Sequence, residues 1–248
     1  MILLYTDFGY EGPYVGQMKA VLAVEAAGTP VIDLMHDAPV HDPHAAAYLL
    51  AALALEMPKG TVCLAVVDPG VGSDRVPVIL EADGRWFVGP DNGLFEILQR
   101  QTDYARQWSI EWRPDRLSRS FHGRDLFVPV AARLANGEAP LGAQYPEGWR
   151  DATSRPGADW PDDLAAVIYI DRFGNAMTGL RAERSSETRQ LMFGGERIPY
   201  AAVFSEVPPG RAFWYKNSCG LVEVSVNRGS AAGVYGLKVG DTFTIENA

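Results

Sequence analysis

The order of hydrophobic and polar segments in the first part of the chain predicts alternating strands and helices. Short apolar runs at 2–5, 31–35 and 61–67 are each closed by polar, proline or glycine residues, which is typical of buried strands. Between them, 14–27 has helical periodicity and 44–57 is an unbroken Ala/Leu-rich segment. This order predicts strands joined by right-handed crossovers, in an α/β sheet that helices cover on both faces.

The pattern then changes. The runs 76–82 and 85–88 predict a hairpin. Two further helical segments are predicted at 94–100 and 127–135. From 136 to 163 the chain is rich in proline, glycine and tryptophan with weak periodicity, which indicates a connector. Five short β-prone runs follow, separated by Gly, Asn and Pro turns, with no convincing helix between them. They are 164–170, 201–204, 212–215, 221–226 and 242–245.

These elements predict two domains. We expect an α/β N-terminal domain at 1–145, with its sheet sandwiched by helices, a connector at 146–163 and a smaller, all-β, barrel-like C-terminal domain at 164–248. No apolar stretch approaches the roughly 18 residues needed to span a bilayer, and the start lacks the basic region of a signal peptide. We therefore expect a cytoplasmic protein that does not bind membranes.

Composition narrows the function classes. The 22 Lys and Arg residues against 31 Asp and Glu give a net charge of -9, which disfavours binding to nucleic-acid phosphates. Cys63 and Cys219 are far apart and match no metal or redox spacing. We expect them to be free thiols in a reducing compartment.

Two segments place an acid directly after a predicted strand. Asp7 is followed by Phe8 and Gly9, so its carboxylate has room to accept hydrogen bonds from a ribose diol. The alternative is a turn or helix-capping aspartate. The second loop, from Asp68 to Arg75, lacks the glycine spacing of a dinucleotide fingerprint. Its proline and glycines could aim both charged side chains into one cleft, or the two could form a solvated surface pair.

Two later segments carry further candidates. His122 stands between an aromatic residue and a glycine, where it could move a proton near neutral pH, or be a buried histidine bonded to backbone. In the segment 171–175, Phe173 could stack on a base and Asn175 could pair with an adenine edge. The alternative there is a plain β-turn.

The segment 35–44 has the composition of a metal site. His36, Asp37, His41 and His44 are suitable ligands. Two prolines prevent a helix that would carry them on one face, and the carboxylates can instead cap the helix that follows.

Seven strings occur in order from Thr6 to Asn227 and cover nearly the whole chain. They are TDFG, YVGQMKAVL, VVDPGVGSDR, GPDNGL, FHGRDLFVPVAA, DRFGN and NSCGLVEVSVN. With them the chain resembles the SAM hydroxide adenosyltransferases. These enzymes hydrolyse S-adenosyl-L-methionine (SAM) to adenosine and L-methionine and are related to the SAM-dependent fluorinase and chlorinase.

The resemblance implies an α/β domain, a C-terminal β-barrel and a homotrimer. SAM would lie between the N-terminal domain of one subunit and the C-terminal domain of its neighbour. Water or hydroxide would attack the ribose 5′ carbon in line, and neither a metal nor a cofactor would be needed.

The resemblance also assigns residues. The catalytic set falls on Asp68, Arg75 and His122, and Asp7 matches the ribose-diol carboxylate. The positions that hold the methionine or adenine end of SAM are Asp171, Phe173, Asn175, Ser218 and Asn227, with Arg228 acting mainly through its backbone. One departure is Gly12, where the family usually carries an aspartate; the neighbouring Glu11 could replace it with a different reach.

Other functions stay open from the residues alone. Halide transfer to the same carbon is disfavoured, because Asp68 would repel an anion and the family's halogenases lack this Asp-Arg-His set. A non-catalytic SAM or adenosine sensor would keep the binding residues without needing Asp68 or His122. A metal-dependent hydrolase would use the histidines of the segment 35–44.

Overall fold

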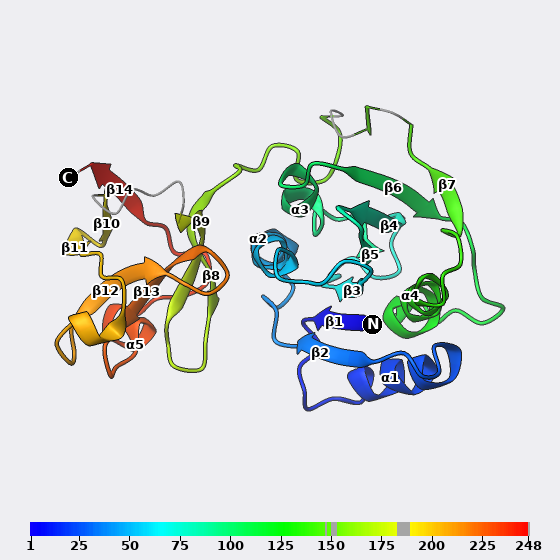
Figure 1. Cartoon of the computed structure of the whole chain (residues 1–248), viewed down its shortest axis with the longest axis horizontal. Helices are drawn as coiled ribbons and strands as arrows, with labels where there is room; N and C mark the ends of the chain where they lie inside the picture. Colours follow the sequence, from blue (N-terminus) through cyan, green and yellow to red (C-terminus); the bar gives the residue numbers. More distant parts are fainter. Residues whose placement is uncertain (147, 150–152, 183–188, 248) are drawn as a thin grey trace. The chain divides into compact units, whose positions relative to one another are not determined.

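The chain folds as two compact units, Met1–Trp160 and Pro161–Ala248 (Figure 1). In this computed structural model the described residues are 1–146, 148–149, 153–182 and 189–247. The first unit is built on one large sheet and the second on two smaller sheets. The two-part architecture, α/β first and mainly β second, agrees with the sequence prediction.

The N-terminal unit contains a seven-stranded sheet with the order β2-β1-β3-β5-β4-β6-β7. Its strands are β1 (Ile2–Thr6), β2 (Val31–Met35), β3 (Val62–Val66), β4 (Pro77–Ala82), β5 (Arg85–Pro90), β6 (Ala105–Ile110) and β7 (Gly142–Gln144). The first three predicted strands and the β4–β5 hairpin are confirmed. Strands β6 and β7 were not predicted, and β7 lies in the stretch 136–163 that was expected to be connector.

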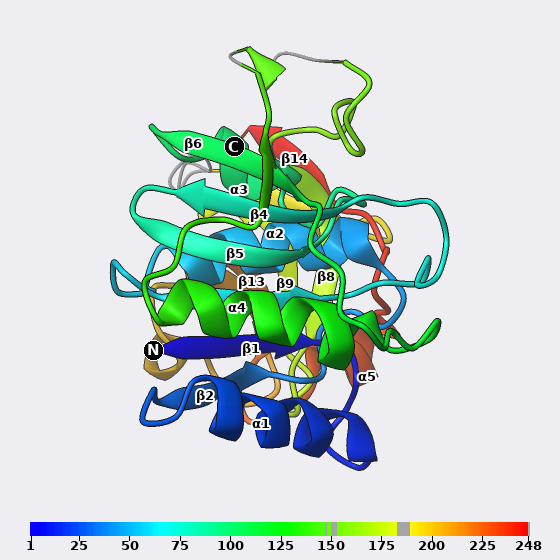
Figure 2. The same ribbon diagram turned by 90° about the vertical axis from the view of Figure 1, so that its right-hand side faces the viewer.

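Helices cover both faces of this sheet. They are α1 (Pro13–Glu25), α2 (Pro43–Ala54), α3 (Glu96–Arg100) and α4 (Val128–Ala135). Helices α1 and α4 pack together on one face, and α2 and α3 on the other, so that α4 and α2 lie on opposite sides of the strands (Figure 2). All four confirm predicted helices. Helix α2 begins where expected, because Asp42 caps it by accepting a hydrogen bond from Ala45 N at 3.0 Å.

The alternation of side chains along the central strands divides the core between these two helix layers. Leu4 of β1 and Leu64 of β3 pack in the cluster that holds Met18 and Leu22 of α1. Tyr5 points the other way, and its hydroxyl donates to Ala46 O of α2 at 2.9 Å. The sheet is therefore held from both sides.

The parallel strands bring their carboxyl ends to one edge. Thr6, the last residue of β1, is in register with Val66, the last residue of β3, and β5 runs parallel to β3. Strands β2 and β3 lie on opposite sides of β1, so the chain changes direction there. Ligands of open α/β sheets bind in the crevice at such a switch point. The loops beginning at Asp7 and Asp68 both leave this edge.

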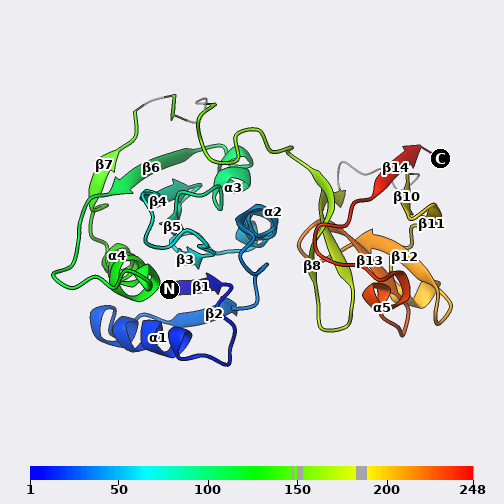
Figure 3. The ribbon, with the colours of Figure 1, turned by 180° about the vertical axis from the view of Figure 1, so that it is seen from behind.

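The C-terminal unit contains a four-stranded sheet, β12-β13-β9-β8, and a three-stranded sheet, β11-β10-β14 (Figure 3). The strands are β8 (Leu164–Ile170), β9 (Ala176–Arg181), β10 (Arg189–Phe193), β11 (Glu196–Ile198), β12 (Ala212–Lys216), β13 (Leu221–Val226) and β14 (Thr244–Asn247). Val167, Val224 and Leu191 belong to one core cluster that both sheets share.

Two predictions for this unit are wrong. The run 201–204 was expected to be a strand, but its apolar residues lead into a short 3₁₀ turn, Phe204–Glu206. A five-residue helix, α5 (Ala231–Tyr235), also forms where no helix was expected. Ser230 caps it by accepting from Gly233 N at 2.9 Å, a signal that the sequence carried. In the described part of the chain, no helix is long and apolar enough to cross a membrane.

Candidate active site

Asp68, Arg75 and His122 meet at the carboxyl edge of the large sheet. Arg75 Nε donates to both carboxylate oxygens of Asp68 at 2.9 Å, and Nη2 donates a further hydrogen bond to Oδ2. The same Nη2 lies 3.3 Å from His122 Nδ1. The Asp68 and Arg75 side chains are only 4% and 10% exposed, so this is a buried ion pair and not a solvated one.

The loop that carries Asp68 is fixed by its own turns and by a neighbouring loop. Val71 N donates to Asp68 O, and Asn92 Nδ2 donates to Val67 O at 2.9 Å. Gly72 has a φ of +84°, and a Cβ there would lie 2.7 Å from Arg119 O. Only glycine allows this close approach, which brings the loop against the chain that leads to His122.

His122 directly precedes a π-helical turn, Gly123–Phe127, which continues into α4. Burial lowers the pKa of His122, and the adjacent Arg75 charge lowers it further, against an opposing effect of Asp68. These surroundings therefore favour the neutral form of the imidazole. Within this turn Arg124 pairs with Asp125 at 2.6 Å, and Asp125 also accepts from Ser118 N at 2.8 Å.

A cavity of about 150 Å³ adjoins Asp68 and His122. Its wall is completed by Phe8, Tyr14, Val66, Val71, Ser120, Phe121 and Gly123. Three of these side chains, Phe8, Tyr14 and Phe121, form a cluster with ring centroids 5.2–6.0 Å apart. The two polar catalytic candidates thus face a largely aromatic and apolar space.

Asp7 lies on the loop after β1, next to Phe8, and the segment after β2 holds it. His41 N donates to Asp7 Oδ2 at 3.0 Å, and Gly9 N donates to His36 O at 2.6 Å. His36 is fully buried and its Nδ1 lies 2.7 Å from Thr6 Oγ1. Gly12 is the N-cap of α1 and Glu11 is exposed, so the departure from the family pattern lies at the start of that helix.

The histidines of the segment 35–44 do not gather around one point. His36 contacts Thr6, His41 is exposed, and His44 packs against Trp160 with ring centroids 4.4 Å apart. Asp42 is used as the cap of α2. Across the described residues, no group of three or more His, Cys, Asp or Glu side chains is arranged to hold a metal ion.

The C-terminal unit has a cleft of its own, of about 760 Å³. Five of the predicted binding residues line it: Asp171, Phe173, Asn175, Ser218 and Arg228. Phe173 is 69% exposed, so its ring is available to a flat ligand. Asn227 is not part of the lining, because its Nδ2 donates to Val207 O at 2.5 Å and anchors the neighbouring loop.

Asp171 builds the turn at one end of this cleft. Its Oδ1 accepts from Phe173 N and from Asn175 N, each at 2.9 Å, and its Oδ2 accepts from Asn175 Nδ2 at 3.0 Å. Gly174 has a φ of +82°, and a Cβ there would overlap Ser230. The segment 171–175 therefore forms the tight turn that was the alternative to a binding role, and it also lines the cleft.

The comparisons with known proteins decide the family. The model of the SAM hydroxide adenosyltransferase N-terminal domain matches residues 2–143, and that of the C-terminal domain matches residues 165–244. The chain belongs to the SAM hydroxide adenosyltransferase family. An (R)-S-adenosyl-L-methionine hydrolase from Thermus thermophilus is 42% identical over 96% of each chain. A protein of the same name from Salinispora arenicola is 38% identical over 97% of this chain and 95% of its own length.

Solved structures show the same architecture. A conserved protein from Thermotoga maritima has a TM-score of 0.88 and 29% identity, covering 99% of both chains. A conserved hypothetical protein from Thermus thermophilus has a TM-score of 0.78 and 39% identity, again covering 99% of both. The architecture of these two solved structures therefore extends over nearly the whole of this chain.

Sequence reasoning missed part of the cleft of this SAM hydroxide adenosyltransferase. Tyr215, Asn217 and Glu223 also line it, together with Met177, Phe204, Val226 and Gly229. Glu223 is the acid within the apolar run of β13, and its residue is only 3% exposed. A carboxylate in the middle of a buried strand was the signal that could have revealed it.

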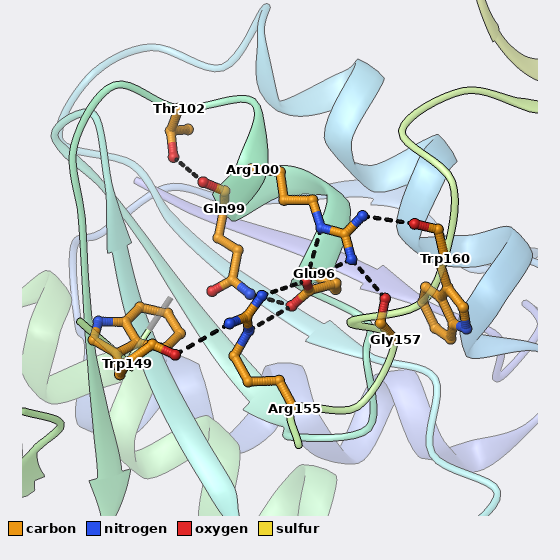
Figure 4. Close-up of polar contacts among 8 residues, drawn as sticks. All are labelled: Glu96, Gln99, Arg100, Thr102, Trp149, Arg155, Gly157 and Trp160. Atoms are coloured by element: carbon orange, nitrogen blue, oxygen red, sulfur yellow. Dashed lines mark hydrogen bonds and ion pairs between the residues drawn. The ribbon is translucent and has the colours of Figure 1, made fainter. Parts of the chain in front are cut away.

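A second buried ionic cluster lies in the N-terminal unit. Glu96 of α3 accepts from Arg100 Nε and from Arg155 Nη2, each at 2.8 Å (Figure 4). Arg155 Nη1 donates to Trp149 O, and Arg100 donates to the carbonyls of Gly157 and Trp160 at 2.7 Å. One carboxylate therefore ties the segment that was predicted as connector to α3.

Proposed function

We propose that the chain hydrolyses SAM to adenosine and L-methionine. The observation that carries this proposal is the contact of His122 with the buried Asp68–Arg75 pair on the wall of an apolar cavity, in a chain that belongs to this family. The relatives are named (R)-S-adenosyl-L-methionine hydrolases, and we extend that substrate and its R epimer to this chain.

The reaction needs a nucleophile more than it needs an acid. The oxygen of water forms a bond to the ribose 5′ carbon as the carbon–sulfur bond breaks. The bonding electron pair goes to sulfur, which changes from a cationic sulfonium to the neutral thioether of methionine. Because the leaving group departs neutral, the site has only to aim the water and accept its proton.

The three side chains suit these roles. Arginine offers only N–H donors, so Nδ1 of His122 accepts from Arg75 and the ring proton is on Nε2. A water beside Asp68 can donate to the carboxylate and accept from His122 Nε2–H. Arg75 holds both partners in place and stabilises hydroxide character as the proton leaves toward Asp68 and solvent. The apolar walls of the cavity lower the local dielectric constant and so strengthen these interactions.

Substrate binding is proposed to use both units. The cavity of about 150 Å³ is smaller than the roughly 300–1,000 Å³ of typical ligand sites, so a further surface is needed to hold SAM. Asp7 would bind the ribose diol, and the cleft at Asp171, Phe173 and Asn175 would hold the remaining parts, with Ser218 and Arg228 at its rim. Asn227 would act indirectly, through the loop that it anchors.

We extend the proposal to a homotrimer in which each SAM site is completed between subunits, and to a barrel-like closure of the C-terminal sheets. The bridge between Ala166 and Thr242 and the shared core support that closure.

We also propose that the chain is active without a metal or cofactor and that it works in the cytoplasm. The free thiols of Cys63 and Cys219 fit a reducing compartment.

The decisive test is chromatography after incubation of the purified, chelator-treated protein with each sulfonium epimer of SAM. Stoichiometric adenosine and methionine from the R epimer, with ¹⁸O from labelled water in adenosine, is the expected result. Binding without products would establish the sensor instead, and activity that returns only with added metal would establish the metallohydrolase.

Subunit mixing tests the shared site. We expect Asp68→Asn and Asn175→Ala to be inactive separately and to regain part of the activity when their subunits are mixed. A monomer by sedimentation, or no recovery after verified subunit exchange, would refute the trimeric site but not SAM hydrolysis.

A further inference from the structure

The face of the four-stranded C-terminal sheet that points away from its core carries an unusual row of side chains. Val222 and Val224 of β13, on either side of Glu223, pack in the core, so the alternation of the strand turns Glu223 to the opposite face. In register with Glu223 are Tyr215 of β12 on one side and Met177 of β9 on the other. All three side chains line the C-terminal cleft. Glu223 is therefore part of the floor of this cleft.

Both oxygens of Glu223 have defined partners. Tyr215 Oη donates to Oε1 at 2.5 Å, and Asn217 Nδ2 donates to Oε2 at 2.8 Å. Asn217 Oδ1 in turn accepts from Cys219 N and Leu221 N at 3.0 and 2.9 Å. The carboxylate is thus fixed in position, and it supports the turn that carries Ser218.

Burying the ionised carboxylate of Glu223 costs free energy. Burial raises the pKa of Glu223, and the negative charge of Asp171 raises it further, while the hydrogen bonds from Tyr215 and Asn217 act in the opposite direction. Two carboxylates thus share one cleft. Such a pair is relieved when a cation enters, because the cation attracts both charges and removes their mutual repulsion.

We propose that Glu223 is a specificity-determining residue that, together with Asp171, selects the cationic methionine part of SAM. This inference rests on the proposed function of the cleft. SAM carries a sulfonium and an ammonium group near its carboxylate, whereas the adenosine product carries no charge. A fixed negative floor binds the substrate more strongly than the product. It thereby favours release of adenosine after the carbon–sulfur bond has broken.

The substitution Glu223→Gln removes the charge of the side chain and keeps its hydrogen bonds. The amide oxygen of glutamine can accept from Asn217 Nδ2, and its NH₂ group can donate to the Tyr215 hydroxyl, which accepts as well as donates. The variant therefore keeps the shape and the partners of the site. A matched control is Glu196→Gln, which removes an equal charge from an exposed position on β11 outside this cleft.

The test measures KM and kcat for SAM, and the inhibition constants of adenosine and S-adenosylhomocysteine, in the full-length protein. For Glu223→Gln we expect KM for SAM to rise about tenfold, equivalent to about 1.4 kcal/mol, with the adenosine constant unchanged within twofold. S-adenosylhomocysteine keeps the ammonium and lacks the sulfonium. A tenfold weaker binding of this analogue would assign the selected charge to the ammonium, and unchanged binding would assign it to the sulfonium.

Two outcomes overturn the proposal. An unchanged KM for SAM would show that the charge has no role, and equal weakening of SAM and adenosine would show a structural role only. A protein that hydrolyses no SAM even as wild type would refute the proposed function instead, so the two failures are distinguishable.

If Glu223→Gln does not fold, a second pair of variants tests the same proposal. Met177→Lys places an ammonium group opposite Glu223 in register, and Met177→Gln is its neutral counterpart of similar length. We expect the lysine variant to bind SAM about tenfold more weakly than the glutamine variant, with equal adenosine binding. Equal SAM binding by the two variants contradicts the proposal.

Discussion

The buried carboxylate of Glu96 gives the sharpest prediction for stability. Glu96→Gln keeps the side-chain shape and removes the charge that faces Arg100 and Arg155. The Glu96 side chain is 2% exposed, and those of its partners are 21% and 16% exposed, so little solvent replaces the lost interaction. The two arginines would keep their backbone acceptors but lose their common counter-ion.

The magnitude follows from this burial. Removing one partner of a buried ion pair costs about 3–5 kcal/mol, because its attraction no longer offsets the cost of burying the opposite charge. In a protein of this size, 1 kcal/mol lowers Tm by about 2–4 °C, so we expect a decrease of about 6–20 °C. Trypsin should also cut after Arg155 more quickly in the variant than in the wild type, because Arg155 loses its ion pair with Glu96.

The assay is thermal unfolding followed by circular dichroism, with Glu81→Gln as the control. Glu81 pairs with Arg106 at 2.6 Å, but the Arg106 side chain is 42% exposed, so that pair is worth about 0–1 kcal/mol. A decrease in Tm no larger for Glu96→Gln than for Glu81→Gln would refute the reasoning.

The same cluster predicts a dependence of stability on pH. Burial raises the pKa of Glu96, but the hydrogen bonds and charges of Arg155 and Arg100 outweigh it, so the net pKa lies below its ordinary value. The stabilisation is therefore complete above the ordinary pKa of glutamate. It is lost as the pH falls through the lowered value. The difference in stability between wild type and Glu96→Gln should shrink over that acidic range.

Three further predictions concern the reaction. His122→Ala and Asp68→Asn should each lower kcat about 10²- to 10⁴-fold while SAM binding persists; near-normal turnover of either would contradict the assigned roles. The wild-type rate should fall as the pH falls through the lowered His122 pKa, and Arg75→Gln should move this decline to higher pH because the neighbouring cation is gone; an unmoved profile would exclude that coupling. Asp7→Asn should raise KM about 10- to 100-fold with little change in kcat, and should have no effect with a 2′,3′-dideoxy analogue of SAM, where no diol is present.

The contact among Asp68, Arg75 and His122 shows how much of the candidate site the sequence alone predicts. Residue types and turn chemistry placed Asp68, Arg75 and His122 at strand ends and loop boundaries, and the resemblance grouped them. The contact between Arg75 and His122 joins residues 47 positions apart, and no local pattern encodes that distance. It depends on Gly72 approaching Arg119, which only the packed chain reveals.

The missed elements have a related cause. Strands β9, β10 and β11 are short or carry glycine and polar residues, so their periodicity is weak and they form only by pairing with neighbours. Glu223 was overlooked because a single acid in an apolar run has no meaning until its neighbours across the strand are known. Tyr215 lies eight positions away in sequence and directly opposite in register.

The π-helical turn after His122 makes the position of this histidine depend on the length of the chain. Val128 N–H bonds to Gly123 O across five residues, so the turn holds one residue more than an α-helical turn. Deleting one residue from it would let α4 continue as a regular helix with its apolar face unchanged. The chain before it would turn by about 100°, carrying His122 away from Arg75. A change in length that leaves every proposed catalytic residue in the sequence would thus give a protein that folds but in which His122 no longer meets Arg75.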